Sequence, residues 1–288
     1  FSYENFDRGL RWMLWGFFMK LCVADRISTY VDAVYNNYME HSGTSLLLAT
    51  FFFTFQIYCD FAGYSLIAIG SSRIMGFHLM ENFHRPYFSR SIKEFWRRWH
   101  ISLSTWFKDY LYIPLGGNRV SHWRHLWNLF VTFLVSGIWH GANLTFVLWG
   151  TLHGLYQVVG IEKNRLLPQV KAPRKLHAVL NCLVTFVLVM FAWIFFRAND
   201  LHSAFEIIGR IFTHQGALFT GEGIPSLLLE FMCIGILMLK ELKDELSLKI
   251  YALDSPHYGV RIASMSLFLA FIILSASFDG GAFIYFQF

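Results

Sequence analysis

The sequence predicts an all-α fold, a polytopic bundle of transmembrane helices, and three observations support this class. Hydrophobic residues make up 55% of the 288 residues, only 15% are charged, and the mean hydropathy is +0.43. This composition is far more apolar than that of an ordinary soluble domain. Apolar runs of membrane-spanning length recur along the chain, and Lys and Arg gather in alternate loops between them, a pattern typical of helices oriented in a membrane.

Seven runs with few or no charges are candidates for membrane crossings. They lie at residues 12–24, 46–72, 126–140, 142–160, 176–196, 224–239 and 262–278. Since a helix rises about 1.5 Å per residue, each run is roughly long enough for a hydrocarbon core about 30 Å thick. Residues 126–160 would form a helix about 52 Å long, so we expect a break near Gly141.

The basic residues divide very unevenly if these runs alternate across the membrane. One side receives 20 of the 24 Lys and Arg residues, in segments 1–11, 73–125, 161–175 and 240–261. The positive-inside rule places this side in the cytoplasm and the C-terminus outside. The same bias explains the net charge of +5, and no basic soluble segment indicates a nucleic-acid partner.

No repeat, low-complexity tract or linker divides the chain, so we expect residues 1–288 to form a single membrane-embedded domain. The chain opens with Phe1 rather than Met, and we interpret it as the C-terminal part of a longer protein. Its four cysteines are scattered singly through apolar runs. We interpret them as core residues, and we expect no metal site.

The segment from Glu81 to His125 carries the clearest local signals. Ser91 and Glu94 form an S-x-x-E capping box, which predicts a helix that begins near Ile92. One face of this helix is apolar and carries Trp96, Trp99, Leu103, Trp106 and Tyr110; another carries Lys93, Arg97, His100, Ser104 and Lys108. This spacing predicts one amphipathic helix, interfacial or re-entrant.

The basic face of this helix has two interpretations that spacing does not separate. It can rest against anionic lipid headgroups, with its tryptophans at the membrane boundary. Alternatively, it lines a funnel where Arg97, Arg98, Ser104 and Lys108 meet an anionic donor such as a phosphate-bearing thioester carrier.

His140 is the most informative single residue. It lies in Gly137-Ile138-Trp139-His140-Gly141, inside an uncharged stretch, and we expect it about 20 Å into the membrane. A polar side chain at that depth is costly and is a functional candidate. A neighbouring helix could also simply satisfy the imidazole, and we interpret His153, further along, as a structural residue.

Several motifs of this chain, in this order, resemble those of the membrane-bound O-acyltransferases. They are residues 55–65 (FQIYCDFAGYS), 81–83 (ENF), 86–87 (PY), 95–106 (FWRRWHISLSTW), 110–117 (YLYIPLGG) and 136–142 (SGIWHGA). The resemblance is greatest to the bacterial branch that O-acetylates alginate or peptidoglycan. The chain departs from the usual pattern of that branch at Leu66, Ile67 and Met80, none of which is a histidine.

The resemblance implies a helix bundle with a tunnel through the membrane and a pair of functional histidines, His140 and His100. It further implies acetyl-CoA or another acyl thioester as co-substrate, with no tightly bound cofactor. The acceptor would be an extracytoplasmic polysaccharide, and an extracytoplasmic acetyltransferase or polysaccharide-binding protein would be a partner. The location would be the bacterial cytoplasmic membrane, with several crossings.

Transfer of an acyl group from a thioester to a hydroxyl needs a base and a donor to the oxyanion. We assign His140 as the base, with His100 assisting, and Asn143 as a weaker candidate for the oxyanion or an orienting bond. Four further residues are expected to support the site, namely Asp60, Tyr64, Trp96 and Trp139. We expect the buried Asp60 to pair with an Arg or His of residues 81–125, or with Tyr64.

Two other classes of function fit parts of the pattern. A transporter or flippase for an acyl or glycan carrier would also use broken helices and a basic vestibule. Alternatively, a catalytically silent scaffold would retain its function with both histidines replaced.

Overall fold

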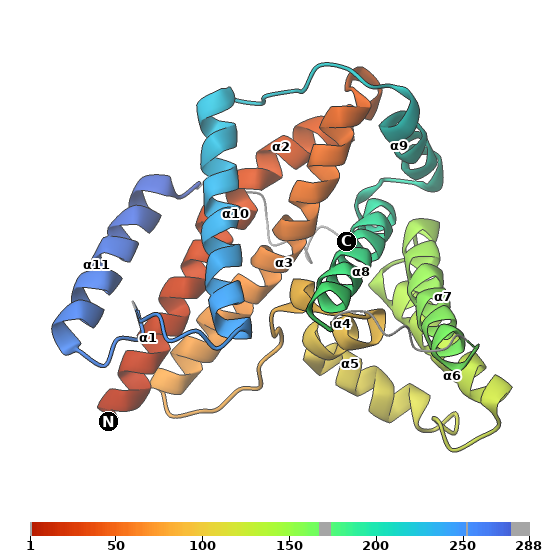
Figure 1. The fold of residues 1–288 in the computed structure, drawn as a ribbon, viewed down its shortest axis with the longest axis horizontal. Coiled ribbons are helices and arrows are strands. Elements are labelled where there is room, and N and C mark those ends of the chain that lie inside the picture. The colour runs from red at the N-terminus through yellow and green to blue at the C-terminus, as the bar shows by residue number, and fades with distance from the viewer. Residues whose placement is uncertain (1, 167–173, 252, 278–288) are drawn as a thin grey trace. The chain divides into compact units, whose positions relative to one another are not determined.

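A computed structural model describes residues 2–166, 174–251 and 253–277, and all regular secondary structure in these ranges is helical. The predicted all-α class is therefore confirmed. The described residues form two compact units, one within residues 2–81 and 216–277 and the other within residues 82–215. Figure 1 colours the helices of both units in chain order.

The first unit contains five α-helices with a π-helix between the first two. They are α1 (Tyr3–Phe17), the π-helix η1 (Phe18–Ala24), α2 (Asp25–Asn36), α3 (Gly43–Ile74), α10 (Ile224–Glu245) and α11 (Tyr258–Ser275), with a short 3-10 helix at Tyr38–Glu40. Helices α1 and α3 lie side by side (Figure 1). A Cβ on Gly16 or Gly63 would lie 2.7 Å from the other glycine's carbonyl oxygen, so only glycine permits this approach.

The second unit carries the segment with the histidines. Its helices are η3 (Pro86–Phe88), α4 (Ile92–Arg98), α5 (Ile101–Phe107), the π-helix η4 (Lys108–Tyr112), α6 (His122–His140), α7 (Leu144–Leu166), α8 (Arg174–Arg197) and α9 (Leu201–Thr213). Helices α6 and α7 lie side by side in Figure 1. Because α6 ends at His140 and α7 begins at Leu144, the predicted break near Gly141 is confirmed.

Four helices in the described ranges are long and apolar enough to cross a membrane. They are α3, α7, α8 from Leu176 onward, and α11. The other three apolar runs are also helical, in α1 with η1, in α6 and in α10. The polytopic membrane class is confirmed, while the assignment of loops to the two sides stays a prediction.

The prediction of one continuous amphipathic helix from Ile92 is wrong beyond Arg98. Its start is confirmed, because the Ser91 hydroxyl accepts a hydrogen bond from the Glu94 amide at 3.1 Å. The helix then ends, and His100 adopts the left-handed conformation, with φ 43°. Backbone bonds to residues 82–84 replace the helical ones: the His84 amide donates to the Arg98 carbonyl, and the Ile101 amide donates to the Asn82 carbonyl.

Candidate active site

His140 is the last residue of α6, and aromatic rings surround its half-buried imidazole. The rings of Trp149 and Phe196 stand nearly perpendicular to it, with centroids 5.1 and 5.2 Å away. The Trp139 ring lies 5.1 Å away. These contacts come from α6, α7 and α8, so three helices fix the position of this imidazole.

Close packing of α6 on α7 sets the place where α6 ends. A Cβ on Gly137 would lie 2.4 Å from the Phe146 carbonyl oxygen, and one on Gly150 would lie 2.4 Å from the Phe133 carbonyl oxygen. Both distances are far below van der Waals contact. Gly137 and Gly150 therefore bring the backbones of α6 and α7 close together, and Gly137 is three residues before His140.

His100 lies between α4 and α5 and is 9% exposed. Its Nδ1 is 3.3 Å from the side-chain oxygen of Asn82 and 3.4 Å from the Ser102 hydroxyl. The Ser102 amide and hydroxyl both donate to the same Asn82 oxygen, at 3.1 and 2.9 Å. Because a backbone amide can only donate, the atom it meets is the oxygen of Asn82.

The arrangement around Nδ1 fixes the tautomer of His100. Two oxygens face this nitrogen, and the Asn82 oxygen can only accept, so Nδ1 carries the proton. Nε2 is then the acceptor nitrogen of the neutral ring. Burial lowers the pKa of His100 to about 4, which keeps the ring neutral at physiological pH.

Ring contacts connect the surroundings of the two predicted histidines: Trp99, next to His100, contacts Trp193, which contacts Phe196, which contacts the His140 ring. Both histidines belong to the second unit. A left-handed backbone is uncommon outside glycine and costs free energy, so His100 is held in place by its surroundings rather than by its own preference. Such strain is frequent where a side chain must be aimed at a reacting group.

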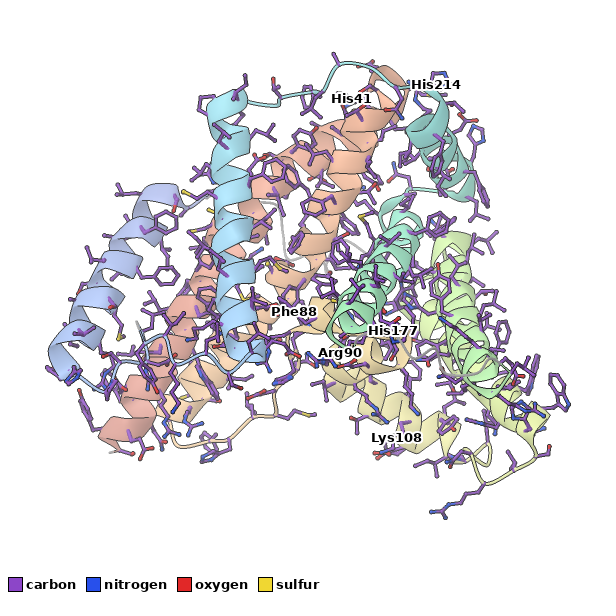
Figure 2. All side chains as sticks on the ribbon, in the orientation of Figure 1. His41, Phe88, Arg90, Lys108, His177 and His214 are labelled. Carbon is purple, nitrogen blue, oxygen red and sulfur yellow. The ribbon has the colours of Figure 1, made fainter. Side chains whose placement is uncertain are left out.

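The second unit contains a cavity of about 790 Å³, lined by residues close to these histidines in the chain but not by the histidines themselves. Its volume is within the usual range for small-molecule sites. Its lining includes Lys93, Trp96, Arg97, Ser104, Thr105, Lys108, Asn118, His125, Ser136 and Gln157. Ile101 also lines it, next to His100, and Ser136 is one helical turn before His140. The Lys and Arg side chains approach from α4 and from the start of η4, where Figure 2 labels Lys108.

Three of the predicted donor-binding residues therefore share this cavity, although their helix is broken. Arg97, Ser104 and Lys108 all line it. Arg98 instead donates to the Glu94 carboxylate at 2.6 Å and to the Arg85 carbonyl at 3.3 Å. The charged residues that line the described cavity are all basic, as a site for a polyanion requires.

Asn143 holds the start of α7. Its side-chain oxygen accepts from the Thr145 amide at 3.1 Å, and its side-chain amide donates to the Asn199 carbonyl at 2.6 Å. Both functional groups of this side chain are thus engaged with backbone. Trp139 remains 55% exposed beside His140.

Two predicted supporting residues, Asp60 and Tyr64, belong to the first unit. The Asp60 carboxylate pairs with the Lys20 ammonium at 2.5 Å, and the same ammonium contacts Asp25 at 2.7 Å. Lys20 was not among the partners that we expected. It lies in the π-helix η1. Tyr64 is 56% exposed.

Sequence reasoning did not single out Asn82, and it interpreted His153 as a structural residue. Asn82 lies within the quoted motif at residues 81–83, yet only the fold brings it to His100, 18 positions later. His153 is fully buried, and its Nδ1 accepts a hydrogen bond from the Trp96 indole at 3.2 Å. Among the described residues, no cluster of three or more His, Cys, Asp or Glu is arranged to hold a metal.

Comparison with known proteins places this site in a family. The model of the MBOAT, membrane-bound O-acyltransferase, family matches residues 4–198. The chain belongs to the membrane-bound O-acyltransferase family. Both histidines, the cavity and Asn82 lie within the matched residues, and the resemblance inferred from the motifs is confirmed.

Relatives of this chain carry three different names. The probable alginate O-acetylase AlgI of Pseudomonas aeruginosa is 39% identical over 250 residues, which are 84% of this chain and 47% of the relative. The peptidoglycan O-acetyltransferase of Helicobacter pylori is 39% identical over 211 residues, 72% of this chain and 39% of the relative. The teichoic acid D-alanyltransferase of Bacillus subtilis is 28% identical over 212 residues, 67% of this chain and 51% of the relative. The chain spans about half the length of these relatives.

Proposed function

We propose that this chain carries the catalytic site of a membrane O-acyltransferase that moves an acetyl group from a cytoplasmic thioester to hydroxyls of an extracytoplasmic polysaccharide. One observation carries the proposal. His140 and His100 belong to the same unit as a cavity whose charged lining is basic, and Ile101 and Ser136, close to them along the chain, line that cavity. Two imidazoles supply proton transfer, and the basic cavity suits a phosphate-bearing thioester.

His140 acts as the general base. It removes the proton of the acceptor hydroxyl as that oxygen attacks the carbonyl carbon of the thioester. The tetrahedral intermediate collapses, the carbon–sulfur bond breaks, and the proton passes from His140 to the departing thiolate. The products are an O-acyl ester and a thiol, so atoms and charge balance.

His100 assists through its acceptor nitrogen. Because Asn82 and Ser102 hold the proton on Nδ1, Nε2 is the nitrogen of the neutral ring that accepts a hydrogen bond in the reaction. It stabilises His140 while that ring carries the proton, in the way an orienting acceptor supports a catalytic imidazolium. His100 is therefore a positioning residue in this mechanism.

Acetyl-CoA is the proposed donor, and Arg97 and Lys108 bind its phosphates. Guanidinium and ammonium groups are suited to phosphate oxygens, and three basic residues line the cavity. Names of the relatives refer to alginate and peptidoglycan, so the proposed acceptor is a cell-surface polysaccharide of this kind. The proposed location is the bacterial cytoplasmic membrane, with an extracytoplasmic partner protein that presents the acceptor.

The proposal is tested with inverted membrane vesicles that contain the full-length protein and enclose the acceptor polysaccharide. Acetyl-CoA labelled in the acetyl group is added outside, at the former cytoplasmic face. We expect one free thiol outside for each labelled ester inside, and neither product with His140→Ala. Labelled thioester inside, with no thiol released, would support a transporter instead and refute the proposed chemistry.

A further inference from the structure

Acyl transfer needs a hydrogen-bond donor for the oxygen that becomes negative in the transition state. In the proposed mechanism His140 transfers the proton and His100 positions His140, so neither donates to this oxygen. Asn143, the candidate expected from the sequence, uses its amide on the Asn199 carbonyl. The donor to the oxyanion must therefore come from other residues near His140.

Three buried side chains in the second unit have an N–H group with no acceptor among the described residues. They are Trp149, Trp193 and His153, exposed by 1%, 1% and 0%. Buried donors in folded proteins are nearly always bonded, because an unpaired donor loses its water without compensation. Three such donors together are a strong indication of a missing acceptor.

The donor atom of His153 follows from its neighbour. The Trp96 indole can only donate, and it meets Nδ1 of His153 at 3.2 Å. Nδ1 is then the acceptor, and the proton of the neutral ring is on Nε2. Nε2 is the atom that has no partner, so it offers an N–H like the two indoles.

The three rings form one cluster. Ring centroids lie 5.0 Å apart for Trp149 and His153, 5.8 Å for Trp149 and Trp193, and 6.4 Å for His153 and Trp193. We call these three residues the donor cluster. Its members come from two neighbouring helices, α7 and α8.

The donor cluster contacts both the wall of the basic cavity and His140. On one side Trp96 lines the cavity, and its ring is 5.0 Å from His153. On the other side the Trp149 ring is 5.1 Å from the His140 ring. Ring contacts thus link the cluster both to a residue of the cavity wall and to His140.

We infer that the donor cluster is a binding site for the carbonyl oxygen of the acyl group. The inference rests on the proposed function and adds the group that stabilises the oxyanion. When the hydroxyl oxygen attacks, the carbonyl electrons move onto this oxygen, and the three N–H groups stabilise the negative charge. When the carbon–sulfur bond breaks, the carbonyl re-forms and the charge leaves with the thiolate, which takes the proton from His140.

Indole and imidazole N–H groups suit this role because they are neutral and rigidly held. Donors fixed in a dry site stabilise a developing charge without the reorganisation that water would need. They also bind a neutral carbonyl only modestly, so their effect is greatest in the transition state, where it raises the rate.

The inference is tested by the infrared carbonyl band of acetyl-CoA labelled with ¹³C in the acetyl carbonyl, bound to the purified full-length protein in lipid nanodiscs. Hydrogen bonds from the donor cluster polarise the carbonyl, so the bound band is expected at lower frequency than the band in solution. Replacement of Trp149 by benzothienylalanine keeps the ring shape and removes the N–H. This variant is expected to shift the band back toward its position in solution.

Kinetics give a second readout on the same variant. Loss of one donor to an oxyanion is expected to lower kcat by about 100-fold, with KM for acetyl-CoA unchanged. The same replacement at Trp15, a buried tryptophan of the first unit, is the control and is expected to change neither the band nor kcat. Trp149→Phe, with Trp15→Phe as its control, repeats the test without an unnatural residue.

Each outcome decides the inference. A bound band at the solution frequency, or a lowered band that the Trp149 replacement leaves in place, overturns the carbonyl site and leaves the proposed function standing. The absence of any protein-bound thioester band refutes the proposed donor, and the inference fails with it. A lowered band that moves only in the Trp149 variant, with the loss of kcat, supports the site.

Discussion

Substitution of Asn82 by Asp tests how His100 is held. The change puts a carboxylate against Nδ1, where the wild-type oxygen lies 3.3 Å away. The Ser102 amide and hydroxyl donate to that oxygen, and such bonds favour an ionised carboxylate. The fold should survive the substitution, because the side chain keeps its shape and the acceptor oxygen.

The size of the effect follows from the pKa of His100, which burial lowers to about 4. A carboxylate in contact raises the pKa of a histidine by about one to three pH units, to between about 5 and 7. At pH 6 the wild-type ring is about 1% protonated, whereas a ring with a pKa of 6 is about half protonated. The neutral form of His100 is the active form. The variant, with its raised His100 pKa, should therefore lose activity at a pH closer to neutral than the wild type does.

The assay is the rate of ester formation in vesicles between pH 4.5 and 8, normalised to each variant's plateau. The acid limb of the Asn82→Asp profile should lie about one to three pH units above that of the wild type. Asn82→Ala, which removes the acceptor without adding charge, should lower the rate at all pH values. Superimposable pH profiles of the wild type and Asn82→Asp would show that Asn82 does not set the protonation state of His100.

Three further predictions concern packing, buried charge and donor binding. Gly150→Ala puts a Cβ 2.4 Å from a carbonyl oxygen of α6. We expect this variant to lower the free energy of unfolding, measured in detergent, by about 1–3 kcal/mol. Gly160→Ala, on the same helix but with nothing within 4 Å of its added Cβ, should leave that free energy unchanged. Lys20→Met leaves two buried carboxylates without their shared ammonium and should lower the free energy of unfolding by about 3 kcal/mol or more. A variant as stable as the wild type would contradict the buried pairing. Arg97→Ala should raise KM for acetyl-CoA about tenfold, most strongly at low salt, whereas Arg98→Ala, whose guanidinium is bound to Glu94, should leave KM close to the wild-type value.

Much of the fold was predictable because membrane helices leave a strong compositional signal. Within the described residues, each of the seven apolar runs contains helix. The break at Gly141 followed from length alone, since one helix of that size exceeds the membrane. The start of α4 was predictable from its cap, which is a local interaction between Ser91 and Glu94.

The parts that failed depend on contacts distant in sequence. The periodicity of residues 96–110 favours one helix, but bonds from residues 82–84 replace helical bonds at His100. The partner of Asp60 is 40 positions away in η1, and no local pattern identifies it. The basic residues nevertheless share a cavity because the helices α4 and α5 both face it.

The histidines could be identified from sequence, but their surroundings could not. A histidine in an uncharged run is conspicuous, whereas Asn82, Trp149 and His153 look like ordinary residues of a motif or a core. Only the structure shows that Asn82 fixes a tautomer and that two indoles and one imidazole have buried N–H groups without an acceptor.

The most direct measurement of the central claim is the O-acetyl content of the extracytoplasmic polysaccharide in cells whose only copy of the full-length protein is wild type, His140→Ala or His100→Ala. Membrane levels of the three proteins are matched by immunoblot. The account predicts loss of the ester with His140→Ala and a partial loss with His100→Ala. Wild-type ester content in both variants would contradict acyl transfer by this pair of histidines.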